Sequence, residues 1–179
     1  MELEGKRIAV LVEDEYQVIE LWYPYYRMKE AGAEVKLVGT GRATQFKSKH
    51  GYAANADLAS ADVKVADFDA VIIPGGYAPD LMRRNADMVR FVHDMDSAGK
   101  PVAAICHAGW MIASAKIVKG RRATCFHSVK DDLVAAGADW VDEPVVVDGN
   151  LITSRVPEDL PAFCRAIVKA LAPQTAAVR

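Results

Sequence analysis

Cys106 and His107 are the residues of this chain whose types and position best suit chemistry. They stand side by side in "PVAAICHAGW" (residues 101–110), after an apolar run and before a helix-like segment. A nucleophile at a sharp strand-to-helix turn needs small neighbours two positions away on each side. Ala104 and Ala108 occupy those two positions. The spacing therefore predicts a nucleophile elbow with the Cys106 sulfur as the attacking atom.

Such a turn is also expected to lower the pKa of the thiol. The positive end of the following helix and nearby amide N–H groups lower a cysteine pKa. The N–H of His107 and that of Gly76, from the Gly75-Gly76 pair after another strand-like run, are placed to form an oxyanion hole. We therefore expect a Cys106 thiolate at neutral pH, with an oxyanion site beside it.

The acid and the base that would serve Cys106 remain open at this point. Glu20 follows the first predicted strand, and a buried, protonated carboxyl there would donate a hydrogen bond to the thiolate. Such a pair favours oxidation to sulfenic or sulfinic acid. The acids of residues 13–15 compete for the same loop. His107 acts as a base only if the bend turns it toward the sulfur, because adjacent residues rarely face each other, and otherwise it lines the pocket.

The other cysteines and histidines are weaker candidates for functional residues. Cys125 and His127 form a rival pair, but no small-residue elbow surrounds them. Cys164 lies on the apolar stripe of a predicted helix and is expected in the core. His50 and His93 stand in polar surroundings. Since the chain has neither C-x-x-C nor H-x-x-x-H, we expect no metal and no cofactor.

Size and composition indicate a soluble globular protein. The chain has 179 residues, 51% of them hydrophobic and 26% charged, so we expect one domain over 1–179 with a core of about 6–172. A net charge of -2 and the lack of long apolar runs argue against nucleic-acid or membrane binding. The start "MELEGKRIAV" is no signal peptide, and three cysteines make no disulfide scaffold, which favours a cytoplasmic location.

Strand-like and helix-like segments alternate along the chain. The predicted strands are 7–12, 34–39, 70–76, 101–106 and 122–126. The predicted helices are 18–32, 78–100, 107–115, 128–138 and 157–171. A hairpin is predicted over 144–154. Because Pro24 removes a helical hydrogen bond, we expect the first regular helix to begin near Trp22, with Glu20 in the turn before it. The alternation predicts an α/β fold, a mostly parallel sheet with helices on both faces. Sites in such folds lie at the carboxyl ends of strands, where Cys106 and the Gly75-Gly76 pair both fall.

Several blocks, in order along nearly the whole chain, resemble the PfpI family of the DJ/ThiJ/PfpI superfamily. They include "ELWYPYYRMKEAGAEV", "DAVIIPGGYAPD", "GKPVAAICHAGW", "VKDDLVAAGADWVDEPVVVDGN" and "SRVPEDLPAF". The resemblance is nearest to the intracellular protease and general stress protein branch. It implies a flavodoxin-like, class I glutamine amidotransferase-like fold and self-association into homodimers or larger homo-oligomers.

The resemblance also implies roles for individual residues. The nucleophile position falls on Cys106, the histidine beside it on His107, the carboxylic acid partner on Glu20 and the oxyanion glycine on Gly76. In protease members, an acidic residue from a neighbouring subunit completes a Cys-His-acid triad, and that position is Asp80 here.

Two positions depart from the best-known protease. Gln17 stands where that protease has a further glutamate, and Phe126 stands where it has a pocket tyrosine. Phe126 is then expected to bind substrate, together with Gly75 and Gly76.

Three functions follow as hypotheses. The leading one is a cytoplasmic stress-response enzyme whose Cys106 acts on reactive carbonyls or their early adducts, like a glyoxalase or deglycase, and is readily oxidised. The second is an oligomer-dependent cysteine peptidase that uses Cys106, His107 and Asp80. The third is a non-enzymatic redox sensor. The expected partners are a second copy of the chain, which the aromatic-rich segment 22–26 also favours, and a small carbonyl or peptide substrate.

Overall fold

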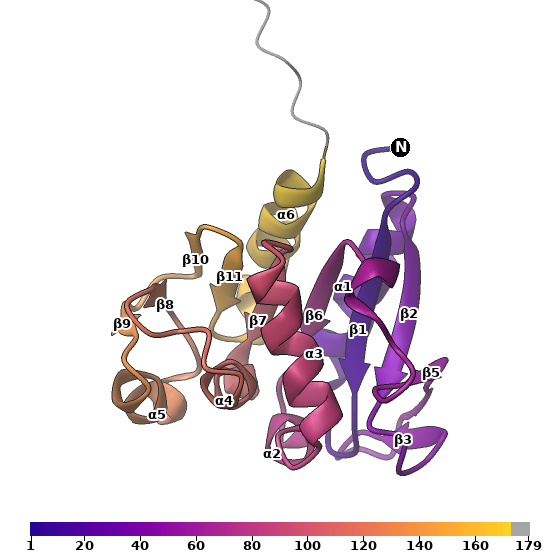
Figure 1. The fold of residues 1–179 in the computed structure, drawn as a ribbon, viewed down its shortest axis with the longest axis horizontal. Coiled ribbons are helices and arrows are strands. Elements are labelled where there is room, and N and C mark those ends of the chain that lie inside the picture. The colour runs from indigo at the N-terminus through magenta and orange to yellow at the C-terminus, as the bar shows by residue number, and fades with distance from the viewer. Residues whose placement is uncertain (173–179) are drawn as a thin grey trace, which may run out of the picture.

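A seven-stranded sheet forms the centre of the molecule, and helices lie on both of its faces (Figure 1). The computed structural model describes residues 1–172. In spatial order the strands are β10 (Val145–Asp148), β11 (Leu151–Ser154), β7 (Val102–Ile105), β6 (Ala70–Ile73), β1 (Arg7–Val12), β2 (Glu34–Gly39) and β5 (Leu58–Ala59). Only β10 runs antiparallel to its neighbour, in the predicted hairpin. The predicted mostly parallel α/β fold is confirmed.

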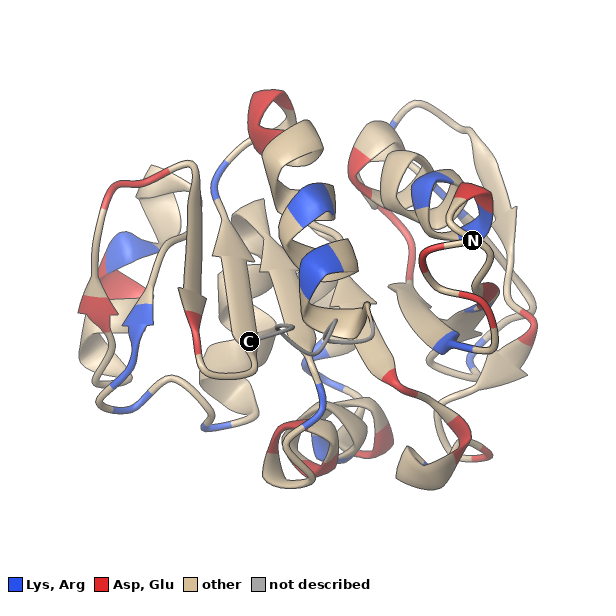
Figure 2. Ribbon diagram, turned by 90° about the horizontal axis from the view of Figure 1, so that it is seen from above, with Lys and Arg blue, Asp and Glu red and all other residues tan. Residues whose placement is uncertain are grey.

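The helices divide between the two faces of the sheet, as Figures 1 and 2 show. On one face α1 (Val18–Glu30) packs against α6 (Leu160–Leu171). On the other lie α3 (Ala86–Ser97) and α4 (Gly109–Ser114), with α2 (Ala78–Met82) and α5 (Lys130–Ala135) against α4. Two small two-stranded sheets complete the fold: β3 (Gln45–Lys47) with β4 (Ala53–Asn55), and β8 (Arg122–Ala123) with β9 (Asp139–Trp140).

The central strands are apolar along their length because both faces of the sheet are covered. Every residue of β6 and β7 is buried, as are all residues of β1 after Arg7. Parallel pairing of β1 with β6 and of β6 with β7 brings the carboxyl ends of these strands to one edge. The loops that follow them therefore meet there, and they carry the candidate site.

The helix α1 begins earlier than predicted. The Gln17 side chain accepts a hydrogen bond of 2.9 Å from the backbone N–H of Glu20 and caps the helix, which therefore starts at Val18 rather than near Trp22. Pro24 lies inside the helix. The Gln17 cap, which the prediction from Pro24 did not consider, starts the helix at Val18 and places Glu20 in its first turn.

Other boundaries also differ from the predictions. The helix expected over 78–100 is two helices, because Asn85 caps a new one by accepting from the Met88 N–H at 2.9 Å. The strand expected over 122–126 is only β8 and lies outside the main sheet. The strands expected over 70–76 and 101–106 end at Ile73 and Ile105, where the loops of the site begin.

Charged residues are spread over the molecule. The sequence has 22 Lys and Arg against 24 Asp and Glu, and Figure 2 shows both kinds interspersed along the ribbon. None of the helices within residues 1–172 has the length and apolar character needed to cross a membrane.

Candidate active site

Cys106 lies at the turn from β7 into α4, in a strained backbone conformation. Its φ is 62°, in the left-handed region that residues with a Cβ rarely adopt. A single-turn 3-10 helix over Cys106–Ala108 leads from the strand into α4, and both Ala104 and Ala108 are buried. The geometry is that of the predicted elbow, and the strain of a left-handed residue is of the order of 1–3 kcal/mol.

Two backbone N–H groups interact with the sulfur, those of His107 and Gly76. Both stabilise a thiolate, as predicted. The net effect of the surroundings is nevertheless the opposite of the prediction: burial raises the pKa of the Cys106 thiol, and the negative charge of Glu20 raises it further. Cys106 is only 7% exposed, so desolvation outweighs the amide dipoles. A thiol that ionises by itself at neutral pH is therefore not what the site contains.

Glu20 is the acid that reaches Cys106. It is fully buried, its Oε2 accepts from the Gly75 N–H at 2.8 Å, and its carboxyl group interacts with the thiol. Its Oε1 has no hydrogen-bond partner within residues 1–172 and remains able to take up a proton. Burial raises the pKa of Glu20 to about 7, against the opposing effects of the Gly75 N–H and the Cys106 thiol.

The competing acids of the same loop are engaged elsewhere. Glu13 accepts from Thr40 and, at 2.7 Å, from Arg42. Asp14 pairs with the same Arg42 at 2.5 Å and accepts from the Lys47 N–H at 2.8 Å. These contacts hold both carboxylates in ion pairs and leave the position beside the sulfur to Glu20.

Glu20 and Cys106 therefore titrate as a pair. When the pair holds one proton, moving it from the sulfur to the carboxylate forms a thiolate without adding a second negative charge to the buried site. The neutral carboxyl group that results no longer repels the negative sulfur. The N–H groups of His107 and Gly76 stabilise the thiolate. The arrangement thus offers proton transfer to Glu20 as a route to a thiolate.

Gly75 and Gly76, the two glycines after β6, are required for different reasons. A Cβ on Gly75 would lie 2.5 Å from Glu20 Oε2 and 2.7 Å from Cys106 Cβ, so the position admits no side chain. Gly76 has a φ of +79°, and its Cβ would lie 2.5 Å from the Glu15 carbonyl oxygen. Because the Gly75 N–H already donates to Glu20, the Gly76 N–H is the one that faces the sulfur.

The bend turns His107 toward the sulfur, with 3.2 Å between His107 Nδ1 and Cys106 Sγ. Its ring stacks on Phe126, with centroids 4.9 Å apart, and meets the Trp110 ring edge-on at 5.0 Å. Burial lowers the pKa of His107, and the nearby His127 lowers it further. The imidazole is therefore neutral at pH 7 and lies within hydrogen-bond distance of the sulfur, but it is not a cation that would hold a thiolate.

The profile of the DJ-1/PfpI family matches residues 6–170. This chain belongs to the DJ-1/PfpI family. It is 47% identical over 165 residues to a protein of Pyrococcus abyssi named a deglycase, covering 92% of this chain and 99% of that one. It is 42% identical over 165 residues to "Deglycase PfpI" of Pyrococcus furiosus, again covering 92% and 99%. It is 40% identical over 161 residues to the "Putative cysteine protease YraA" of Bacillus subtilis, covering 90% and 95%.

Solved structures agree with this family membership. A two-domain protein of Anabaena variabilis, with DJ-1/ThiJ/PfpI-like and ferritin-like domains, matches with a TM-score of 0.91 and 40% identity over 98% of this chain and 52% of that one. DJ-1beta of Drosophila melanogaster matches with a TM-score of 0.87 and 29% identity, covering 93% and 90%.

Asp80 takes no part in the site of this DJ-1/PfpI chain by itself. Its carboxylate pairs with Arg84 one turn along, and within residues 1–172 no contact joins it to His107. Phe126, by contrast, forms a wall of the site through its stacking on His107. The structure thus brings together Cys106, His107, Glu20, Gly75, Gly76 and Phe126, and it leaves Asp80 apart within one chain.

Two contacts of the site escaped sequence reasoning. Gln17 stood out only as a replaced acid, yet it caps α1 and so fixes the turn that carries Glu20. Ser128 Oγ lies 3.5 Å from His107 Nε2, and only the fold brings the two together. Within residues 1–172 no group of three His, Cys, Asp or Glu side chains is arranged to hold a metal ion.

Proposed function

We propose that this DJ-1/PfpI protein is a cytoplasmic, cysteine-dependent stress-response enzyme that acts on reactive carbonyls or their early adducts. The observation that carries the proposal is the buried Glu20–Cys106 pair, in which a carboxyl with a pKa of about 7 contacts a thiol. A base of that strength exchanges protons at neutral pH. The relatives named deglycases, 42–47% identical over almost their full length, support the same class of reaction.

The first step joins sulfur to carbon. The Cys106 proton passes to Glu20, and the thiolate attacks the aldehyde carbon of a dicarbonyl to give a hemithioacetal. The oxygen that becomes negative is stabilised by a backbone N–H of the pair that now faces the sulfur, His107 or Gly76. With an early amine adduct, the attack expels the amine, which takes up a proton as it leaves.

The later steps move protons and return the thiol. A base removes the proton from the former aldehyde carbon, and the neighbouring carbonyl carbon receives one, which turns the hemithioacetal into a thioester of a hydroxy acid. Water then hydrolyses the thioester, releasing the hydroxy acid and the Cys106 thiol. Glu20 and the neutral His107 are the two groups at hand to carry these protons, and no redox partner is required.

The surroundings of the sulfur suit a small substrate. Cys106 is 7% exposed. A three-carbon dicarbonyl or a single modified side chain reaches such a sulfur more easily than folded polypeptide does.

Three variants test the proposal. We expect the wild type to consume methylglyoxal and to release amines from freshly formed methylglyoxal adducts. Cys106→Ala should lose both activities, and Asp80→Ala should keep them. Cys164→Ala is the matched control, because it removes a thiol that is buried within α6. Carbonyl turnover that survives in Cys106→Ala would refute the proposal.

The 3.2 Å contact between His107 Nδ1 and Cys106 Sγ supports a second candidate function, that of a cysteine peptidase. The relative named a putative cysteine protease points the same way. Asp80 would then serve from a neighbouring copy of the chain, and peptide cleavage would be lost in both Cys106→Ala and Asp80→Ala. A redox sensor remains the third candidate, which clean peroxide oxidation of Cys106 without any turnover would support.

Self-association accompanies either activity in this proposal. The outer face of α1 exposes Ile19, Tyr23 and Tyr26, which are 48%, 43% and 60% accessible. This apolar patch is unusual on a monomer and suits contact with a second copy. Sedimentation of the wild type and of Tyr26→Glu tests it: the variant should shift toward the monomer.

A further inference from the structure

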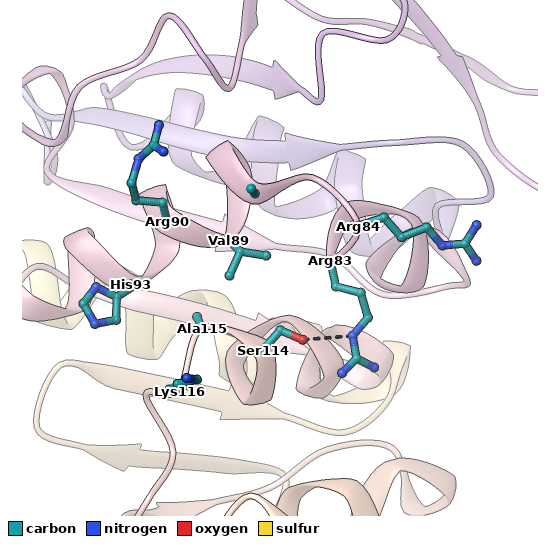
Figure 3. Close-up of a pocket in the computed structure, with 9 residues that line it drawn as sticks. Arg83, Arg84, Val89, Arg90, His93, Ser114, Ala115 and Lys116 are labelled. Carbon is teal, nitrogen blue, oxygen red and sulfur yellow. Dashed lines mark hydrogen bonds between the residues drawn. The ribbon is translucent and has the colours of Figure 1, made fainter.

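A groove of about 530 Å³ lies between α3, together with the connection that precedes it, and the carboxyl end of α4 (Figure 3). Its lining is strongly basic: it contains Arg83, Arg84, Arg90, His93 and Lys116, with no acidic side chain. The six-residue α4 separates it from the Cys106 elbow, roughly 10 Å at 1.5 Å per residue. The groove is therefore distinct from the candidate active site.

Two of these cations, Arg83 and Lys116, have no carboxylate partner within residues 1–172. Arg84 pairs with Asp80, and Arg90 pairs with Asp87 at 2.6 Å. Arg83, which is half-buried, donates only through Nε, to Ser114 Oγ at 2.9 Å (Figure 3). Its two terminal NH₂ groups have no protein hydrogen-bond partner among residues 1–172, and in the same range no ion pair involves Lys116. On a chain with a net charge of -2, such a local excess of positive charge needs a counterpart.

Lys116 occupies a position where glycine is favoured. The Lys116 N–H bonds to the Ala113 carbonyl and the Ile117 N–H to the Ile112 carbonyl, a Schellman motif that closes α4 with Lys116 at a φ of 59°. The same two bonds close α1, α3 and α5, and there the left-handed residues are Gly32, Gly99 and Gly137. Of these four helices only α4 carries a lysine at this place, and that lysine lines the basic groove.

A glycine at position 116 would close α4 with less strain. The lysine keeps that strain and adds an ammonium group to the groove lining. Backbone strain retained in this way is typical of positions where a side chain serves binding. The attraction of a cation for the carboxyl end of a helix is a weaker explanation, because α1, α3 and α5 end in the same way without a lysine at this position.

We propose that this groove binds a phosphate group carried by a small molecule, with Arg83 and Lys116 as its main ligands. The planar guanidinium of Arg83 matches two phosphate oxygens, and the ammonium of Lys116 adds a mobile point charge. The Ser114 hydroxyl, which already orients Arg83, lies in the same lining. The site is independent of the proposed carbonyl chemistry.

The charge pattern favours a small phosphate ester over a nucleic acid. A volume of about 530 Å³ falls within the range of small-molecule sites. A nucleic acid requires a continuous track of unpaired cations along its backbone, whereas here the neighbouring Arg84 and Arg90 are neutralised by Asp80 and Asp87.

Calorimetric titration with inorganic phosphate, ribose 5-phosphate and a short single-stranded oligonucleotide, at low ionic strength, tests the proposal. We expect saturable binding of phosphate and ribose 5-phosphate that weakens with added salt. Arg83→Gln and Lys116→Gly should each raise the Kd at least about fivefold, since each removes a charge-assisted hydrogen bond. Lys169→Gln, which removes an exposed lysine of α6, should leave the Kd unchanged.

Lys116→Gly separates binding from folding. Since it relieves the left-handed strain, its Tm without ligand should equal or exceed that of the wild type while its affinity falls. Methylglyoxal turnover should be the same in all of these variants, so failure here and failure of the proposed function are distinguishable. Absence of saturable phosphate binding, an equal loss in Lys169→Gln, or binding of the oligonucleotide alone would overturn the proposal.

Discussion

Glu20 and Cys106 approach each other across the Cα of Gly75, at a place where a single added methyl group would touch both. The acid comes from the first turn of α1, the sulfur from the elbow after β7 and the glycine from the loop after β6. Three segments that are far apart in sequence thus determine how closely the Glu20 carboxyl group approaches the Cys106 thiol.

Gly75→Ala should push the acid and the sulfur apart, because position 75 has no room for a side chain. Its Cβ would lie 2.5 Å from Glu20 Oε2, and unlike Gly76 it is not in the left-handed region. We expect carbonyl turnover to fall about 100-fold or more, the usual contribution of general acid–base catalysis. Gly51→Ala is the control: its φ is +78° and its surroundings are open, so some stability should be lost while activity stays. Equal activity losses in the two variants would contradict this account.

Glu20→Gln should abolish the rise of activity with pH near neutrality. Below the Glu20 pKa of about 7 the pair holds two protons and no thiolate forms, so wild-type kcat/KM should increase as pH rises through that value. Glutamine still accepts from the Gly75 N–H but cannot take the thiol proton. We expect turnover at pH 7 to fall about 100-fold or more. Glu30→Gln, on the exposed end of the same helix, should keep both the rate and the profile.

The same substitution should change how stability depends on pH. Burial raises the Glu20 pKa from 4.5 to about 7, so below pH 4.5 the folded and unfolded states are both protonated and nothing is lost. Between these values the unfolded state releases the proton first, and the free energy of unfolding should fall by about 3 kcal/mol as pH rises past 7. Urea unfolding at pH 4 and pH 8 measures this change. Glu20→Gln should lack this loss and Glu30→Gln should keep it; a Glu20→Gln curve parallel to the wild type would exclude a buried, ionising carboxyl.

Mild peroxide should oxidise Cys106 well before the other two cysteines. Burial raises the pKa of all three thiols, Cys106 included, but among the described residues only the Cys106 thiol has a buried carboxyl group, that of Glu20, beside it to accept its proton. Cys106 is also the most exposed of the three, at 7% against 1% and 1%. Peptide mapping by mass spectrometry should give a rate for Cys106 at least about tenfold higher, reduced in Glu20→Gln. Equal rates at the three positions would contradict an activated site.

The elements of the fold were predictable where the pattern is strong. Continuous apolar runs marked β1, β6 and β7, and small residues around Cys106 marked the elbow. What escaped prediction depends on side-chain hydrogen bonds that hydrophobic periodicity does not register. The caps at Gln17 and Asn85 are of this kind: one moved the start of α1 and the other divided a helix in two.

The site was predictable in its members more than in its electrostatics. Position along the strands brought Cys106 and the Gly75-Gly76 pair to one edge, and the fold does the same. The direction of the Cys106 pKa shift was wrong, because the helix dipole can be read from sequence while the degree of desolvation cannot. The choice of Glu20 over Glu13 and Asp14 likewise needed the positions of Thr40 and Arg42.

Pro24 lies one turn after Glu20 and cannot donate a hydrogen bond to the Glu20 carbonyl. The turn that carries the acid is thus held by one bond fewer than the rest of α1. The proline that ordinarily weakens a helix thus lies beside the buried acid, and the backbone there relies on the Gln17 cap and on packing in place of that bond.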